Sequence, residues 1–259
     1  MPATRAITRR AMFAGLAGCA GLGAAALFRR RRIVNSPERF VVADYTDTTG
    51  KTLADVPDPV RRLVLFFIGQ SNGANYGGSP LAEPFDAGVM MLNPADGLLY
   101  RGGDPVLGCD GTGANIAIKI ANILRQRDIA SNVVIVDRCL GGTSSADWAS
   151  GGSANSRITS SLSQLSALSL SVDCWIDIQG EQDTGLSIGS DEFFDNKRSM
   201  EGTIRGAGST ARLIRPYCTY LGGTTERRNI IRAGQLATID ETKNIFLGPD
   251  LDLIGDRDD

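Results

Sequence analysis

Histidine is absent from this chain of 259 residues. Without an imidazole, the chain cannot complete a Ser-His-Asp or Cys-His relay from its own residues, ligate a metal through histidine, or switch its charge through histidine near neutral pH. Aromatic residues are also scarce, at 6%. The hydrophobic share of 42% and the charged share of 22% are still those of a folded globular protein, and the length suits one large α/β domain or two small ones.

Acidic residues are missing from the first 32 positions, which hold seven arginines. The rest of the chain has 20 basic and 29 acidic residues, a net charge near −9. A nucleic-acid-binding protein needs a basic face. We therefore expect no nucleic-acid partner.

Residues 1–32 form a leader, with a basic start and an apolar run at 11–28 that is rich in alanine and glycine. Thr8-Arg9-Arg10, followed by Phe13, resembles a twin-arginine export signal. We therefore expect an exported protein, with a cytoplasmic location as the alternative.

The form of the exported protein stays open at this stage. The alanines at 24–26 offer a cleavage site, and residues 16–19 resemble a lipobox in which Cys19 would carry a lipid. The four arginines at 29–32 disfavour processing, which leaves an uncleaved membrane anchor as the third form. The expected product is periplasmic, membrane-anchored or a lipoprotein, and the leader could tether it to the membrane.

Four cysteines lie beyond the leader, and none belongs to a Cys-x-x-Cys pair, which argues against a zinc or thioredoxin-type site. Export would permit disulfides, but the interpretation we favour is buried thiols, because three of the four lie in or beside apolar runs. The four are Cys109, Cys139, Cys174 and Cys218.

Short apolar runs alternate with amphipathic stretches over most of the chain. Continuous apolar runs of this length are typical of strands buried on both faces of a parallel sheet. The alternation predicts an α/β fold. Strands are expected at 63–68, 132–137, 172–178, 213–221 and 244–247, and helices at 113–127, 156–168, 191–207 and 226–239.

The predicted domain spans residues 61–259 and follows a polar lead-in at 33–60. Residues 73–112 are expected to form a long loop region rich in glycine and proline, of a kind that is more often functional than filler.

A polar, glycine-bearing segment follows each of the first three predicted strands: GQSN at 69–72, GGTSSADW at 141–148 and QGEQD at 179–183. Sites in open α/β sheets form at the carboxyl ends of strands, so these three blocks should meet. Ser71 is placed to be a nucleophile. The backbone N–H of Gly142 and the amide of Gln179 could donate to a developing oxyanion.

In this order and spacing the three blocks resemble the SGNH/GDSL hydrolase superfamily, and more narrowly its sialate O-acetylesterase and acetylxylan-esterase-like branch. The resemblance covers about residues 60–259. It implies a three-layer α/β/α fold with a five-stranded parallel sheet of flavodoxin-like order. It also implies a serine esterase that removes O-acetyl groups from carbohydrates or acts on other small esters, without a metal or cofactor.

Carried over by position, Ser71 matches the nucleophile of this family. Its own backbone N–H, the Gly142 N–H and the Gln179 side chain match the oxyanion hole. For two acidic residues of the third block, a local alternative is that they cap the N-terminus of the next element. Three further residues match motif positions that hold loops in place: Asn72, Glu181 and Asp183. Trp148 matches an aromatic residue that packs under the second block.

The family closes its site with Asp-x-x-His, whereas this chain ends in an Asp-rich run at Asp259. If Asp259 is the orienting Asp of that motif, its His would fall three residues further on. If Asp256 is, Asp259 occupies the His position. We prefer the first register, which predicts a copy truncated before the catalytic His.

We therefore expect an esterase whose hydrolysis is impaired. The alternative is a non-catalytic relative that binds acetylated carbohydrate on the same scaffold. A third hypothesis, catalysis through another base such as a nearby carboxylate, is disfavoured because a serine hydroxyl is a poor nucleophile without an adjacent base.

Overall fold

The computed structural model describes residues 43–81, 86–220 and 223–254. The leader and the two tail residues Asp256 and Asp259 lie outside these described residues. Within them, no helix combines the length and the apolar character that crossing a membrane requires.

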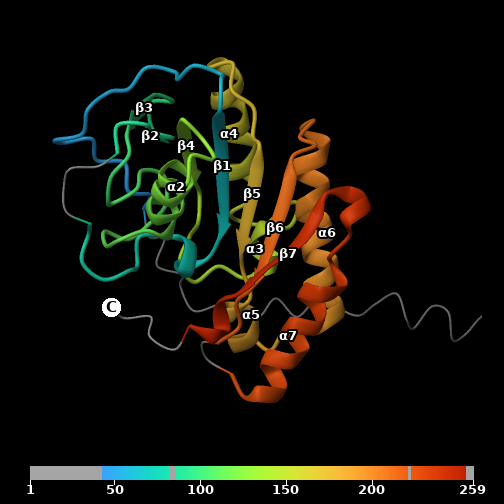
Figure 1. Ribbon diagram of the computed structural model, residues 1–259. Coiled ribbons are helices and arrows are strands. Elements are labelled where there is room, and N and C mark those ends of the chain that lie inside the picture. The colour runs from blue at the N-terminus through green and yellow to red at the C-terminus, as the bar shows by residue number, and fades with distance from the viewer. Residues whose placement is uncertain (1–42, 82–85, 221–222, 255–259) are drawn as a thin grey trace, which may run out of the picture. The chain divides into compact units, whose positions relative to one another are not determined.

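A seven-stranded sheet forms the centre of the fold, in the order β3-β2-β4-β1-β5-β6-β7 (Figure 1). Six strands run parallel, and β3 pairs antiparallel with β2 at one edge. The strands are β1 (Arg62–Gly69), β2 (Val89–Leu92), β3 (Leu99–Arg101), β4 (Asn132–Asp137), β5 (Cys174–Ile178), β6 (Arg212–Tyr217) and β7 (Ile245–Asp250).

The expected number of five strands was wrong. The five predicted strands are present as β4-β1-β5-β6-β7, an order that corresponds to the flavodoxin-like 2-1-3-4-5. The two additional strands, β2 and β3, come from residues 73–112, which we expected to be a loop region. Strands of four and three residues are too short to stand out as apolar runs among glycines and prolines.

Helices cover both faces of the sheet. Alternate residues of β1 face opposite sides: Val64 and Phe66 pack with α3, α4 and α6, and Leu65 and Phe67 pack with α2. α7 packs against α6 and α5. The helices are α2 (Ile116–Gln126), α3 (Ser145–Trp148), α4 (Ser156–Ala167), α5 (Glu181–Gly185), α6 (Ser190–Gly206) and α7 (Thr225–Ala237), with 3-10 turns η1 (Ser71–Gly73), η2 (Glu241–Lys243) and η3 (Leu251–Leu253).

The described part of the lead-in, residues 43–60, runs along the β3 edge of the sheet. Tyr45 exchanges backbone hydrogen bonds with the segment at 108–109, and the Ala54 N–H donates to the Leu99 carbonyl at 2.9 Å. The lead-in therefore adds backbone hydrogen bonds to the edge formed by the short strand β3.

The cysteines beyond the leader form no disulfide, as the favoured interpretation predicted. Cys109, Cys139 and Cys218 are buried, and Cys174 is partly buried. Burial, and next the neighbouring Asp137 carboxylate, raise the pKa of the thiols of Cys109 and Cys139. These two thiols are therefore protonated at neutral pH and poorly nucleophilic.

A buried cluster of charges lies between α6 and the sheet. Asp177 of β5 accepts from Lys197 Nζ and from Arg215 Nε, each at 2.8 Å, and all three side chains are fully buried. Arg215 also reaches Glu201, at 3.2 Å. Burial by itself raises the pKa of Asp177, but the two cations together lower this pKa by more than burial raises it, so the net pKa lies below its ordinary value. The cluster thus holds α6 to β5 and β6.

We predict that Lys197→Met lowers the free energy of unfolding by about 3 kcal/mol, because it takes one of the two cations from the buried Asp177 carboxylate and leaves Arg215 to pair with both Asp177 and Glu201. Lys243→Met is the matched control, because Lys243 is exposed and its pairing with Asp240 is a surface contact. Urea titrations of the two variants would measure the difference. Equal losses in both would contradict the structural role of the cluster.

Candidate active site

The turn after β1 brings Ser71 to the carboxyl edge of the sheet. Gly69 has φ +131°, and a Cβ at this position would lie 2.0 Å from the carbonyl oxygen of Ile178. Only glycine can therefore stand here. Gln70 follows in extended conformation, and Ser71 begins the single 3-10 turn η1. This local geometry places Ser71 beside the end of β5, partly exposed.

Gln70 joins the first polar block to the third. Its Nε2 donates to Glu181 at 3.0 Å, and its Oε1 accepts from the Gln182 N–H at 3.0 Å and from Gln179 Nε2 at 3.1 Å. Gln70 itself is 2% exposed. A buried carboxamide with this many partners fixes the position of the turn that carries Ser71.

The second block is fastened to the other two. The Leu140 N–H donates to the Gly69 carbonyl at 2.9 Å. Thr143 Oγ1 lies 3.2 Å from the same carbonyl, donates at 2.7 Å to the Leu140 carbonyl, and accepts from the buried Trp148 Nε1 at 3.1 Å. Asp183 accepts from the Ser145 N–H at 2.7 Å. The three segments that the sequence places after three different strands therefore do lie together, and Trp148 supports the second one from below.

The Gln179 side chain is directed into this network. It is fully buried, and its Nε2 donates to the Thr143 carbonyl and to Asp183, both at 2.7 Å, as well as to Gln70. The three acceptors around Nε2 fix the orientation of the amide, and Oε1 is buried without a partner among the described residues. Both amide hydrogens of Gln179 therefore already have acceptors among the described residues, and donation to an oxyanion would replace one of these hydrogen bonds.

Two backbone N–H groups of the first and second polar blocks remain available. Within the described segments, the N–H groups of Ser71 and Gly142 donate to no acceptor. Gly142 has φ +71° and open space around it. The preceding peptide is anchored, since the Gly141 N–H donates to both oxygens of Asp110 at 2.9 and 3.0 Å. Such fixed, unused donors can stabilise a developing negative charge.

The three supporting residues of the motifs make contacts between segments. Glu181 accepts from Gln70, and Asp183 accepts from Ser145 and Gln179. The N-cap of α5 is Gly180, so no side-chain cap hydrogen bond forms there, but Glu181 and Asp183 lie in the first turn of α5, where the helix dipole favours acids, as the local alternative predicted. Asn72 donates through Nδ2 to Cys218 Sγ at 3.0 Å. These residues position loops through hydrogen bonds to other segments of the chain.

Two groups whose hydrogen bonds the sequence did not predict, Asn115 and Tyr76, line the same cavity as Ser71. Asn115, the N-cap of α2, donates through Nδ2 to Asp137 at 2.9 Å and to Asn75 at 3.0 Å. Tyr76 donates its hydroxyl to Asp110 at 2.7 Å. An asparagine before a helical pattern is a known N-cap signal, so Asn115 could have been found, but the partners of Tyr76 and Asp137 depend on the tertiary fold.

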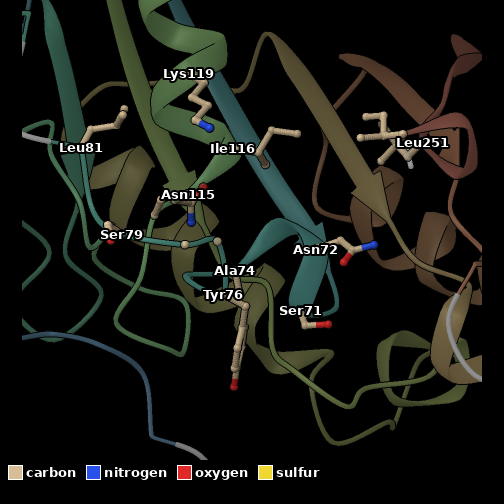
Figure 2. Close-up of a pocket in the computed structure, with 14 residues that line it drawn as sticks. Ser71, Asn72, Ala74, Tyr76, Ser79, Leu81, Asn115, Ile116, Lys119 and Leu251 are labelled. Atoms are coloured by element: carbon tan, nitrogen blue, oxygen red, sulfur yellow. The ribbon is translucent and has the colours of Figure 1, made fainter. Parts of the chain in front are cut away.

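A cavity of about 620 Å³ opens at Ser71. Figure 2 shows Ser71, Asn72 and Tyr76 from the segment after β1, together with Asn115, Ile116 and Lys119 from the start of α2. Leu251 and Ile254 complete the wall. This volume lies in the range of small-molecule sites.

The last described residues are held by ionic contacts. Arg232 of α7 pairs with Asp250 at 2.6 Å and with Asp252 at 2.9 Å, and Asp252 also accepts from the Thr219 N–H at 2.7 Å. These contacts hold η3 and Leu251 at the cavity. The described residues contain no group of three or more His, Cys, Asp and Glu side chains that could hold a metal ion.

The carboxyl of Asp137 generates a prediction about pH. Burial raises its pKa to about 6, against 3.8 for the unperturbed group. The folded state therefore binds a proton more tightly than the unfolded state, and the resulting stabilisation is lost as the pH rises from about 4 to about 6. Relative to Asp137→Asn, the native chain should lose stability over this interval in urea titrations.

Asp104 and Asp183, whose pKa values burial also raises, occur in both proteins and cancel in this comparison. Parallel stability curves for the two proteins would contradict the prediction. Carboxyl NMR titration of the native chain measures the pKa of Asp137 directly.

No protein-family model and no curated protein matches the chain. Solved structures do. A protein from Arabidopsis thaliana, known from an X-ray structure at 1.6 Å, aligns with a TM-score of 0.59 and 16% identity over 73% of this chain and 85% of that one. A carbohydrate acetylesterase from Xanthomonas citri aligns with a TM-score of 0.52 and 18% identity over 76% of this chain. The alignment spans 51%, about half, of the acetylesterase. At these identities the likeness concerns the fold alone, and this α/β fold is one that a carbohydrate acetylesterase also uses.

Proposed function

We propose that this protein is a serine esterase scaffold of the SGNH type that takes O-acetylated carbohydrates or other small esters, with Ser71 as the nucleophile. One observation carries the proposal. Ser71 stands at the carboxyl edge of β1 and lines a cavity of about 620 Å³, on a turn fixed by buried hydrogen bonds. The distant fold neighbour that is a carbohydrate acetylesterase supports the same reaction class.

The chemistry follows from the positions of these groups. Ser71 Oγ attacks the acyl carbon of the ester, and its proton passes to a base. The carbonyl oxygen becomes an oxyanion that the N–H groups of Ser71 and Gly142 stabilise. Collapse of the tetrahedral intermediate releases the alcohol, and water then hydrolyses the acyl-enzyme. In this proposal Gln179 is a positioning residue that locks Thr143 and Gln70 in place.

The site lacks the usual general base of a serine esterase, because these 259 residues contain no imidazole. Asp110 does not substitute for it, since its carboxylate already accepts from the Gly141 N–H and from the Tyr76 hydroxyl. Burial, and next the hydrogen bond to Asp110, raise the pKa of Tyr76 to about 12, so its hydroxyl is protonated at neutral pH and accepts no proton. In subtilisin, removal of the His costs about 10⁶ in turnover. We therefore propose that this chain hydrolyses esters very slowly by itself.

A second candidate function is favoured by the same lack of imidazole beside an intact cavity. On this alternative the chain binds acetylated carbohydrate without hydrolysing it. The two candidates separate in one respect: binding alone predicts no turnover that depends on Ser71, whatever base is supplied.

We predict that added imidazole restores hydrolysis of p-nitrophenyl acetate in a manner that depends on Ser71. A general base contributes about 10²–10⁴ to a rate, so the increase over the chain without imidazole should reach about 10²-fold. Ser71→Ala should show only the background rate of imidazole itself. Ser79→Ala is the matched control, because Ser79 lines the same cavity outside the first polar block.

Three outcomes decide between the candidates. Equal rates for the native chain and Ser71→Ala in imidazole would contradict the esterase proposal. If NMR then still shows an O-acetylated sugar bound, the binding function replaces it. Rapid turnover without imidazole that depends on Ser71 would contradict the proposed impairment only.

A further inference from the structure

Asp110 is a fully buried carboxylate that joins two separate segments of the site. Its Oδ1 accepts from the Gly141 N–H at 2.9 Å, and its Oδ2 accepts from the same N–H at 3.0 Å and from the Tyr76 hydroxyl at 2.7 Å. We propose that Asp110 is a positioning residue that holds the Gly142 N–H in place as an oxyanion donor. The oxyanion in this inference rests on the proposed function, whereas the fixing of Gly142 rests on these contacts alone.

The turn that carries Gly142 is flexible by composition. Leu140 and Thr143 close it, with the Thr143 N–H 3.3 Å from the Leu140 carbonyl, and its two central residues are glycines. Gly142 has φ +71° and open space where a Cβ would lie. Because glycine restricts its own backbone so little, the direction of the Gly142 N–H depends on how the residues on either side are held.

Both sides of this turn are held by buried side chains. On the far side, the Thr143 carbonyl accepts from Gln179 Nε2 at 2.7 Å. On the near side, a Cβ at Gly141 would lie 2.8 Å from the Tyr76 hydroxyl oxygen and 3.0 Å from Asp110 Oδ2. A larger residue would have to displace these two groups, so the Gly141 backbone is seated directly against the pair formed by Asp110 and Tyr76.

Asp110 also connects this turn to the segment that follows Ser71. The Asp110 carbonyl accepts from the Asn75 N–H at 2.9 Å. The buried Asn75 side chain donates to the Val106 carbonyl at 2.8 Å and accepts from the Val106 N–H at 2.9 Å. Tyr76 is the next residue, and it lines the cavity together with Ser71 (Figure 2). The proposed nucleophile and the proposed second donor are thus fixed to one buried segment.

A carboxylate suits this role better than a neutral acceptor. Hydrogen bonds to an ionised acceptor are roughly twice as strong as bonds between neutral groups, so Asp110 holds the Gly141 N–H firmly. Burial, and next the hydrogen bond to Asp110, raise the pKa of Tyr76 to about 12, so its hydroxyl stays a donor at neutral pH. The two donors together take up the charge of Asp110, which would otherwise oppose an oxyanion nearby.

Formation of a boronate adduct tests the proposal. Methylboronic acid is titrated into the full chain in imidazole buffer and followed by boron NMR. A B–O bond forms to Ser71 Oγ, the serine proton passes to imidazole, and boron becomes an anionic tetrahedral centre. Asp110→Leu, which removes the acceptor, should weaken this adduct by about 10-fold to 100-fold, somewhat less than the 10²–10³ that deleting an oxyanion donor costs. Asp110→Asn should lie between the two, because its amide oxygen still accepts but carries no charge.

The matched control is Asp96→Leu. Asp96 also accepts from a tyrosine hydroxyl, that of Tyr100 at 2.7 Å, and from a backbone N–H, that of Leu98 at 2.9 Å, but it lies between β2 and β3 and does not line the cavity. This variant should leave the adduct unchanged. Tyr76→Phe keeps the ring and removes one hydrogen bond of Asp110, so it should weaken the adduct by about fivefold.

The backbone amide signal of Gly142 separates positioning from a merely structural role. In a proton–nitrogen NMR spectrum the native chain should give one sharp Gly142 signal, which should broaden in Asp110→Leu and stay sharp in Asp96→Leu. Adduct affinity and a Gly142 signal that are both unchanged in Asp110→Leu would overturn the proposal. If Asp110→Leu does not fold, Tyr76→Phe decides, and an unchanged adduct in that variant would overturn the proposal equally.

Failure of this proposal and failure of the esterase proposal give different results. If the native chain forms no adduct while the Gly142 signal depends on Asp110, the esterase and the oxyanion role are overturned, and Asp110 stands as the residue that fixes Gly142. An adduct that depends on Ser71 but not on Asp110 or Tyr76 would overturn the role of Asp110 alone.

Discussion

The close approach of β1 to the end of β5 at Gly69 is the constraint on which the site depends. A side chain at this position would collide with the Ile178 backbone, so the chain can turn here only as glycine. The approach puts Gln70 within reach of Gln179, Gln182 and Glu181. It also brings the Gly69 carbonyl to the Leu140 N–H of the second segment, which donates to it at 2.9 Å. Any shift of this turn would therefore disturb all three polar blocks together.

The network behind Ser71 is a positioning device built from buried, mostly neutral groups. Gln70, Gln179 and Thr143 are each at most 2% exposed, and each is held by more than one partner. Buried polar groups that are satisfied in this way rigidify a site, which is what a fixed oxyanion hole requires. The same network contains no group that is free to accept the proton of Ser71. The carboxylates of the network accept hydrogen bonds from backbone and side-chain donors instead. Geometry for attack and capacity for proton transfer are thus separate properties of this chain.

The sequence predicted the strands that are long and buried, because such strands appear as continuous apolar runs. β1, β4, β5, β6 and β7 were found in this way, whereas β2 and β3 were missed because they are short and lie among turn residues. The convergence of the three polar blocks followed from a general rule about strand ends. The direction of the Gln179 amide did not, since it depends on acceptors supplied by Thr143 and Asp183 from other segments.

The central claim, that Ser71 Oγ faces an accessible oxyanion site, can be measured with the base supplied by an imidazole buffer. A small alkylboronic acid adds to the Oγ of a positioned serine to give an anionic tetrahedral adduct, while the serine proton passes to the buffer imidazole, and boron NMR distinguishes this adduct from the free trigonal acid. The native chain should give the tetrahedral signal, and Ser71→Ala should lose it. The absence of the signal from the native chain, or its persistence in Ser71→Ala, would contradict the claim.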